Sequence, residues 1–237
     1  MSESRAEILG AVKNALRHAR LPESARPNSN ASPAEHLGDH RANLIPARGT
    51  LGTKARIDLF IREAERVNAT VARVSGLDGV PREVARYLSK QNLPTTLRIA
   101  PAIAEPTVPW TSQSLLTAEP GRAEGSDAVG VSRAFAGVAE TGTLVMLSAP
   151  DSPTTLNFLP PTHVVVIAAA DIAGDYETVW ARVRAAGAGN EKGFMPRAVN
   201  WITGPSRTAD IEQMLLLGAH GPQRLHIVIV DDEVAHP

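Results

Sequence analysis

The segment GPSRTADIE, from Gly204 to Glu212, combines residue types that could bind a small anion. It follows a predicted buried strand and opens a predicted helix over residues 208–217. In open α/β sheets, such strand-to-helix junctions line the crevice at the carboxyl ends of the strands. The free N–H groups of the first helical turn, with Arg207 nearby, would suit a carboxylate or a phosphate. The predicted ligand-binding residues of this segment are Gly204, Ser206, Arg207 and Thr208.

Two acidic residues in the same segment, Asp210 and Glu212, place negative charge where an anion would bind. They could bond to the free N–H groups themselves, or act as acid–base groups or metal ligands. A structural explanation is also available, because Ser206 or Thr208 followed by acidic residues is typical of any well-capped helix. On spacing alone, the capped helix is the simpler interpretation.

A second candidate is the sequence Glu140–Thr141–Gly142–Thr143, which lies between two predicted strands. The Glu140 carboxylate, beside two hydroxyl groups and a flexible glycine, could serve as a general base or a nucleophile, with Thr141, Gly142 and Thr143 contacting the ligand. The alternative is a tight turn in which the threonines bond to the backbone and Gly142 supplies a positive φ. A glutamate is an unusual turn residue within so apolar a stretch, which slightly favours a functional role.

Two histidines lie at element boundaries. His163 precedes a predicted strand at residues 164–168, and His220 follows the predicted helix at 208–217. A helix of that length would place His220 at the opposite edge of the sheet from Ser206 and near His163. The pair is therefore a candidate second site or subunit contact, although half-buried hydrogen-bonding histidines are common at such boundaries. The histidines show no metal-ligand spacing, and no metal site is predicted.

Several familiar motifs are missing. The sequence has no Gly-rich dinucleotide fingerprint, no phosphate-binding loop of the Walker type and no Gly–x–Ser–x–Gly elbow, so tightly held NAD or ATP is not supported. It also contains no cysteine, which excludes disulfides, a thiol nucleophile and a cysteine-ligated iron–sulfur cluster within this chain. No cofactor is predicted in the chain itself.

Hydrophobic periodicity predicts an α/β fold. Strands are expected at residues 69–74, 95–100, 128–139, 144–148, 164–168, 198–203 and 225–230. Helices are expected after residues 53 and 78, and over 175–186 and 208–217. This alternation favours a parallel sheet with helices packed on it. The Pro-, Thr- and Gly-rich stretch 101–127 is expected to wrap the surface, anchored by Trp110, Leu115 and Leu116.

The first 52 residues differ from the rest. A capping box and apolar residues at four-residue spacing predict a helix over residues 4–19. Residues 21–52 hold scattered prolines among Ser, Asn and Gly, which indicates an extended arm. The expected organisation is an N-terminal helix and arm at 1–52, followed by one α/β domain at 53–237.

Composition narrows the function classes. A net charge of −1 with interspersed signs argues against a nucleic-acid or membrane surface. The charged first twenty residues lack the apolar core of a signal peptide. The longest apolar run, Val164 to Ala170, is far shorter than the ~20 residues that span a bilayer. The sequence is therefore expected to fold as a soluble, cytoplasmic protein without membrane insertion.

Four motifs occur in an informative order: AETGT at residues 139–143, LPPTH at 159–163, GPSRTADIE at 204–212 and GAHGP at 218–222. Together they resemble the LUD domain of the lactate-utilisation protein C family (LutC or YkgG type), roughly from Thr53 to Asp231. The resemblance implies a three-layer α/β/α fold with a mostly parallel sheet, related to the NagB/RpiA/CoA-transferase group. It also implies a role beside iron–sulfur partner proteins in oxidising L-lactate to pyruvate.

Two functions follow as hypotheses. The chain could be a non-redox component of a lactate-oxidising complex, with the iron–sulfur clusters held only by its partners. It could instead be a stand-alone enzyme of the CoA-transferase or sugar-phosphate-isomerase type, acting on a small carboxylate, phosphate or acyl-CoA with Glu140 as base or nucleophile. A scaffold without any ligand is a third possibility.

Overall fold

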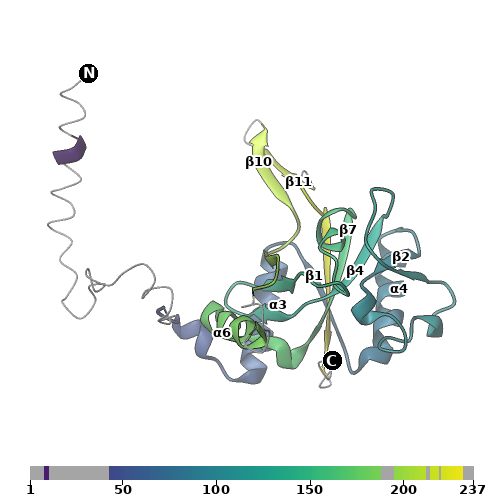
Figure 1. Ribbon diagram of the computed structural model, residues 1–237, viewed down its shortest axis with the longest axis horizontal. Helices are drawn as coiled ribbons and strands as arrows, with labels where there is room; N and C mark the ends of the chain where they lie inside the picture. The colour runs from purple at the N-terminus through teal and green to yellow at the C-terminus, as the bar shows by residue number, and fades with distance from the viewer. Residues whose placement is uncertain (1–7, 11–42, 188–194, 212–213, 219, 232–237) are drawn as a thin grey trace. The chain divides into compact units, whose positions relative to one another are not determined.

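A computed structural model of the chain describes residues 8–10, 43–187, 195–211, 214–218 and 220–231 (Figure 1). By their internal contacts the residues form two units, Met1–Asn43 and Leu44–Pro237. Within the helix predicted over 4–19, residues 8–10 are helical and the others lie outside the described residues. Most of the predicted arm, residues 21–42, also lies outside them. The end of the arm contains a short 3-10 helix, η2 (Ala47–Thr50), and belongs to the second unit.

A six-stranded sheet forms the centre of the second unit. In spatial order its strands are β1 (Thr70–Val74), β12 (Arg224–Val230), β7 (Thr162–Ala168), β4 (Val129–Arg133), β2 (Thr96–Ile99) and β3 (Thr117–Pro120). Each pair of neighbours is parallel. Every residue of β7 is buried, as expected for a continuous apolar strand covered on both faces. The predicted α/β fold with a mostly parallel sheet is confirmed.

A second, four-stranded sheet was not predicted. Its order is β8 (Ile172–Ala173), β5 (Ala136–Val138), β6 (Thr143–Leu147) and β9 (Val199–Ile202). The single strand predicted at 128–139 is divided between the two sheets. The Ala134 N–H donates to the Val166 carbonyl in the large sheet, and the Phe135 N–H donates to the Val145 carbonyl in the small sheet, each at 2.9 Å. The chain therefore passes from one sheet to the other between these two residues.

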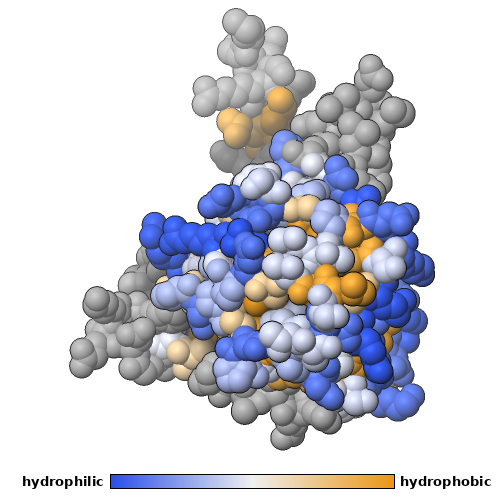
Figure 2. Space-filling model, turned by 90° about the vertical axis from the view of Figure 1, so that its right-hand side faces the viewer, coloured by the Kyte–Doolittle hydropathy of each residue, from blue (hydrophilic) through white to orange (hydrophobic). Residues whose placement is uncertain are grey.

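Helices cover both faces of the large sheet (Figure 1). On one face packs α4 (Val80–Lys90), which follows η3 (Leu77–Gly79). On the other face lie α3 (Thr53–Arg66) and the small sheet, whose far side is covered by α6 (Tyr176–Gly187). The surface on the α4 side is largely hydrophilic, with a cluster of hydrophobic side chains within it (Figure 2). In the described part of the chain, no helix combines the length and the apolar composition needed to cross a bilayer.

The stretch from residue 101 to 127 contains η4 (Pro101–Ile103) and η5 (Trp110–Ser112) and then supplies the edge strand β3. Trp110 is an anchor, as predicted, because its ring is buried and its Nε1–H donates to the Ile103 carbonyl at 2.7 Å. Leu116 packs partly buried against the same core. The prediction for Leu115 is wrong, since 72% of this residue is exposed.

The helix predicted over residues 208–217 is wrong. The chain forms an antiparallel hairpin of β10 (Arg207–Ile211) and β11 (Met214–Leu217), in which Thr208 pairs with Leu216. Gly218, at φ +84°, turns the chain back toward the body. Ile211, Met214 and Leu215 have helical spacing, but the pairing of β-branched and apolar residues across the hairpin overrides that local signal. The predicted anion site at a helix N-terminus therefore does not exist.

Gly142 occupies the turn between β5 and β6, where it meets the backbone of α3. Its φ is +65°, which disfavours any side chain. A Cβ at this position would lie 2.3 Å from the Ala64 nitrogen and 2.6 Å from the Glu63 carbonyl carbon. The turn therefore packs directly on the helix, and only glycine permits this approach.

We expect Gly142→Ala to lower the free energy of unfolding by about 2–4 kcal/mol, from backbone strain and overpacking combined. Urea denaturation monitored by circular dichroism measures the change. The matched control is Gly125→Ala, because a Cβ at Gly125 would meet no atom within 4 Å. An alanine at 142 that is tolerated as well as one at 125 would contradict the close packing of this turn on α3.

Candidate functional site

A cavity of about 290 Å³ lies at the seam between the two sheets. His163 and Leu225, the second residues of β7 and β12, line it from the large sheet. Trp201 and Ile202 of β9 line it from the small sheet. The expectation that the 204–212 segment would face the carboxyl ends of the large sheet's strands is wrong, because His163 and Leu225 mark the amino-terminal edge. We refer to this cavity as the seam pocket.

Ser206 is held in the wall of the seam pocket by the two ends of the hairpin. Its N–H donates to the Pro222 carbonyl, and its carbonyl accepts from the Gly218 N–H, both at 2.9 Å. The His220 N–H reaches the Ser206 Oγ at 3.4 Å. His220 therefore lies beside Ser206, whereas the helix expected at 208–217 placed it at the opposite edge of the sheet. Both residues, and His163, line the same pocket.

His163 is completely buried in the seam pocket. Its Nε2 is 2.7 Å from the Ser132 Oγ, and that hydroxyl donates to the Asn157 Oδ1 at 3.5 Å. Burial lowers the pKa of His163 to about 3, so the ring is neutral at physiological pH. The His163 Nδ1 is buried and has no hydrogen-bond partner among the described residues. The pocket thus contains one buried polar atom that is free to bind a ligand.

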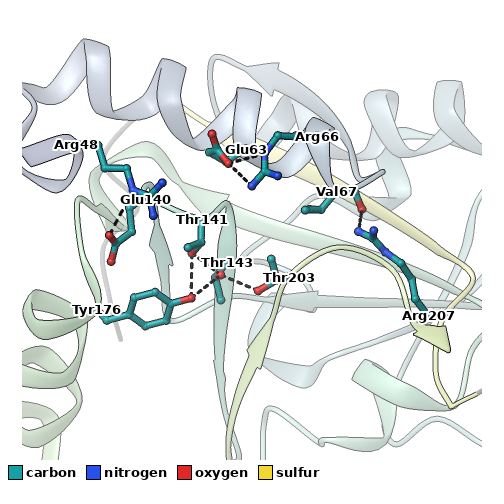
Figure 3. A network of polar contacts seen from close by, with 10 residues as sticks. All are labelled: Arg48, Glu63, Arg66, Val67, Glu140, Thr141, Thr143, Tyr176, Thr203 and Arg207. Carbon is teal, nitrogen blue, oxygen red and sulfur yellow. Dashed lines mark hydrogen bonds and ion pairs between the residues drawn. The ribbon is translucent and has the colours of Figure 1, made fainter. Parts of the chain in front are cut away.

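Arg207 supplies a cation to the seam pocket. One of its Nη groups donates to the Val67 carbonyl at the end of α3, while the residue as a whole remains exposed (Figure 3). Gly204 permits this arrangement. It has φ +74°, and a Cβ there would lie 2.4 Å from the Val67 oxygen and 3.0 Å from the Arg207 Nη2. An exposed guanidinium fixed by one of its N–H groups can still present others to an anion.

A chain of hydroxyl groups connects the Glu140–Thr143 turn to the seam pocket (Figure 3). Thr141 and Thr143 are 2.7 Å apart at their Oγ1 atoms, and both contact the Tyr176 hydroxyl, at 2.9 and 3.1 Å. Thr143 also lies 2.7 Å from the Oγ1 of Thr203, which lines the pocket. The turn therefore supports the pocket wall from behind without lining it.

Glu140 lies apart from these hydroxyl groups. Its carboxylate is buried and forms an ion pair with Arg48 at 3.7 Å, and its N–H donates to the Gly174 carbonyl at 3.1 Å (Figure 3). Glu140 is not among the residues that line the seam pocket. The geometry ties this carboxylate to η2, and its suggested role as base or nucleophile remains a prediction.

The acidic residues of the 204–212 segment gain no position in the pocket. Thr208 and Asp210 lie in β10, and Glu212 lies outside the described residues. Within the described ranges, no group of three or more His, Asp or Glu side chains is placed to hold a metal ion.

Sequence reasoning overlooked several polar residues around the pocket: Ser132, Asn157, Tyr176 and Thr203. Each lies within or beside an apolar segment, where a polar side chain must find a partner to be buried without cost. Ser132 interrupts the apolar strand β4, and Asn157 is buried in the short helix α5 (Thr155–Phe158). That interruption is the one signal that could have identified them.

Known proteins resemble this chain in sequence and in fold. A family model described as LUD domain matches residues 57–230. The Lactate utilization protein C of Exiguobacterium sp. (strain ATCC BAA-1283 / AT1b) is 32% identical over 195 residues, covering 82% of this chain and 81% of that protein. The Lactate utilization protein C of Geobacillus sp. (strain WCH70) is 36% identical over 105 residues, 44% of this chain, and the match spans only 42% of that relative's length.

A solved structure shares the fold. The crystal structure of a DUF162 family protein from Deinococcus radiodurans superposes with a TM-score of 0.54 at 20% identity, covering 76% of this chain and 99% of that one. At this level of identity the likeness concerns the fold alone.

Besides His163, a second histidine is buried in the large sheet. His226 of β12 stacks on Tyr87, with ring centroids 4.0 Å apart, and its Nδ1 lies 2.8 Å from the Thr70 hydroxyl. Burial lowers the pKa of His226 to about 4, although the Glu83 carboxylate 3.3 Å from its Nε2 opposes this shift. Both buried rings are therefore neutral in the folded protein above about pH 4.

We expect the free energy of unfolding to fall as the pH falls from 6.5 toward 4. Below the histidine pKa of ~6.5 the unfolded chain binds protons that the folded chain excludes, costing up to about 1.4 kcal/mol per pH unit for each histidine. Urea denaturation at pH 7 and pH 5 measures the loss, above the range where most carboxylates titrate. His226→Gln should reduce the slope by about half. Equal stability at pH 7 and pH 5 would contradict the burial of neutral histidines.

Proposed function

Because the chain belongs to the LUD domain family, and within it to the lactate utilization protein C proteins, we propose that it is a component of lactate utilisation. In this proposal it binds a small carboxylate in the seam pocket and acts in the oxidation of L-lactate to pyruvate. Electron transfer is the task of partner proteins that carry iron–sulfur clusters. The names of the relatives support the pathway, and the seam pocket supports the ligand class.

The observation that carries the ligand class is the position of Arg207 and Ser206 on one small pocket. A guanidinium with free N–H groups binds a planar carboxylate through paired hydrogen bonds. The Ser206 Oγ accepts from the His220 N–H and keeps its own proton to donate. At about 290 Å³, the pocket is at the lower end of the range for drug-sized ligands. It therefore suits a molecule of a few heavy atoms.

The apolar part of the pocket wall supports a small organic ligand over inorganic phosphate. Phe158, Trp201 and Leu225 line it together with Pro205 and Pro222. Ligand sites typically combine apolar walls with a few placed polar groups, which fix the orientation of the ligand. A short carbon chain would contact the apolar wall while its charged end meets Arg207.

The division of labour rests on the composition of the chain. With no cysteine in its 237 residues, it has no thiolate to bind an iron–sulfur cluster. In this proposal the protein contributes through binding and assembly, and its partners accept the electrons from lactate. The stand-alone enzyme with Glu140 as base receives less support, because that carboxylate is paired with Arg48 and is not among the residues that line the pocket.

We expect Arg207→Gln to weaken the binding of L-lactate at least about tenfold, a loss of about 1.4 kcal/mol, because the charged hydrogen bonds are lost. Isothermal titration calorimetry on the full chain measures the affinity, and a thermal-shift series with lactate, pyruvate, phosphate and CoA defines the ligand class. Arg62→Gln is the matched control, since Arg62 is an exposed residue of α3 that does not line the pocket. If phosphate or CoA stabilises the protein while lactate and pyruvate do not, the proposed ligand class is wrong.

The assignment to lactate oxidation is tested by reconstitution. The chain is purified with its iron–sulfur partners, and lactate-dependent dye reduction is measured with and without it. We expect omission of the chain, or the Arg207→Gln substitution, to lower the rate. Equal rates without the chain, together with a failure to co-purify, would remove the proposed role.

A further inference from the structure

The buried His163 Nδ1 needs an explanation. Buried polar atoms almost always have a hydrogen-bond partner, and an exception within a pocket commonly marks the place of a water or a ligand. His163 is fully buried, lines the seam pocket and leaves this nitrogen without a partner among the described residues. What the nitrogen can bind depends on which of the two ring nitrogens carries the proton.

The neighbours of the ring determine its tautomer. The Asn157 Oδ1 can only accept a hydrogen bond, so the Ser132 hydroxyl directs its proton toward that oxygen. The Ser132 oxygen then accepts from the His163 Nε2–H at 2.7 Å. This arrangement satisfies both contacts, whereas the other tautomer would require the single Ser132 proton to serve two acceptors. The proton therefore resides on Nε2, and Nδ1 carries a lone pair.

Burial keeps the ring in this state. With a pKa of about 3, the imidazole does not take up a second proton at neutral pH, and Nδ1 remains an acceptor. Ser132 is only 1% exposed and is not among the residues that line the pocket. It therefore orients the ring and is not itself offered to a ligand as a nucleophile.

We propose that His163 Nδ1 accepts a hydrogen bond from a hydroxyl group of the ligand, so that the seam pocket prefers a 2-hydroxy acid to the corresponding 2-oxo acid. This inference rests on the proposed binding of a small carboxylate in the same pocket. Arg207 and Ser206 hold the carboxylate, which both acids share. His163 reads the adjacent carbon, where a hydroxyl can donate a proton and a keto oxygen cannot.

The affinity of the full-length chain for L-lactate and for pyruvate, measured by calorimetry, tests the preference. We expect lactate to bind about tenfold more tightly, because a keto oxygen leaves the acceptor unpaired and opposes its lone pair. Ser132→Ala should reduce this preference, since it frees the Nε2 proton and allows the ring to change tautomer. Ser126→Ala, at an exposed loop position, is the matched control and should retain it.

The tautomer is tested without any ligand. Long-range ¹H–¹⁵N correlation spectra of the full chain at pH 7 should show His163 protonated at Nε2 and unprotonated at Nδ1. A proton on Nδ1 would overturn the inference. Equal affinity for the two acids, or tighter binding of pyruvate, would overturn it and leave the carboxylate pocket intact. Failure of both acids to bind would remove the pocket's proposed function together with this inference.

Discussion

The hydrogen bond between Thr143 and Thr203 is the contact on which the site's geometry depends. Thr143 begins β6 in the small sheet, and Thr203 is the first residue after β9, which pairs with β6. The contact fixes the point at which the chain leaves the sheet and enters Gly204–Arg207. It is itself held in place from behind, because Thr141 and Thr143 share the Tyr176 hydroxyl and Gly142 rests on α3. A shift of the turn would therefore move the pocket wall.

The seam pocket exists because two sheets share one chain. His163 is a residue of the large sheet, whereas Ser206 and Arg207 follow the last strand of the small sheet. The two sheets are joined covalently at Ala134–Phe135 and through the core formed by α3, β7 and β12. A deeply buried polar group in one rigid sheet thus faces a loop anchored to another. Sites supported by rigid elements keep their geometry more accurately than sites built only of loops.

The sequence contained enough information to predict the parallel sheet but not the pocket. Runs such as Val164–Ala168 and Leu225–Val230 are uninterrupted because both faces are buried, and that pattern is local. The small sheet depends on where the chain changes partners, and nothing in the apolar stretch 128–139 marks that point. The hairpin at 207–217 has helical spacing, so pairing across the turn overrode the local signal. Since the predicted positions of Ser206 and His220 relied on that helix, their neighbourhood could be found only in three dimensions.

The two ends of the pocket contribute different kinds of recognition. A guanidinium such as that of Arg207 attracts carboxylates in general, so it contributes affinity without telling one small acid from another. Discrimination between a hydroxyl and a keto group needs a polar atom whose donor or acceptor character is fixed. His163 meets that condition because burial prevents its protonation and Ser132 and Asn157 select its tautomer. A solvent-exposed histidine could exchange tautomers freely and would discriminate poorly. The deep burial of a polar ring in an otherwise apolar strand, which costs stability, is therefore the feature that gives this pocket its capacity for chemical selectivity.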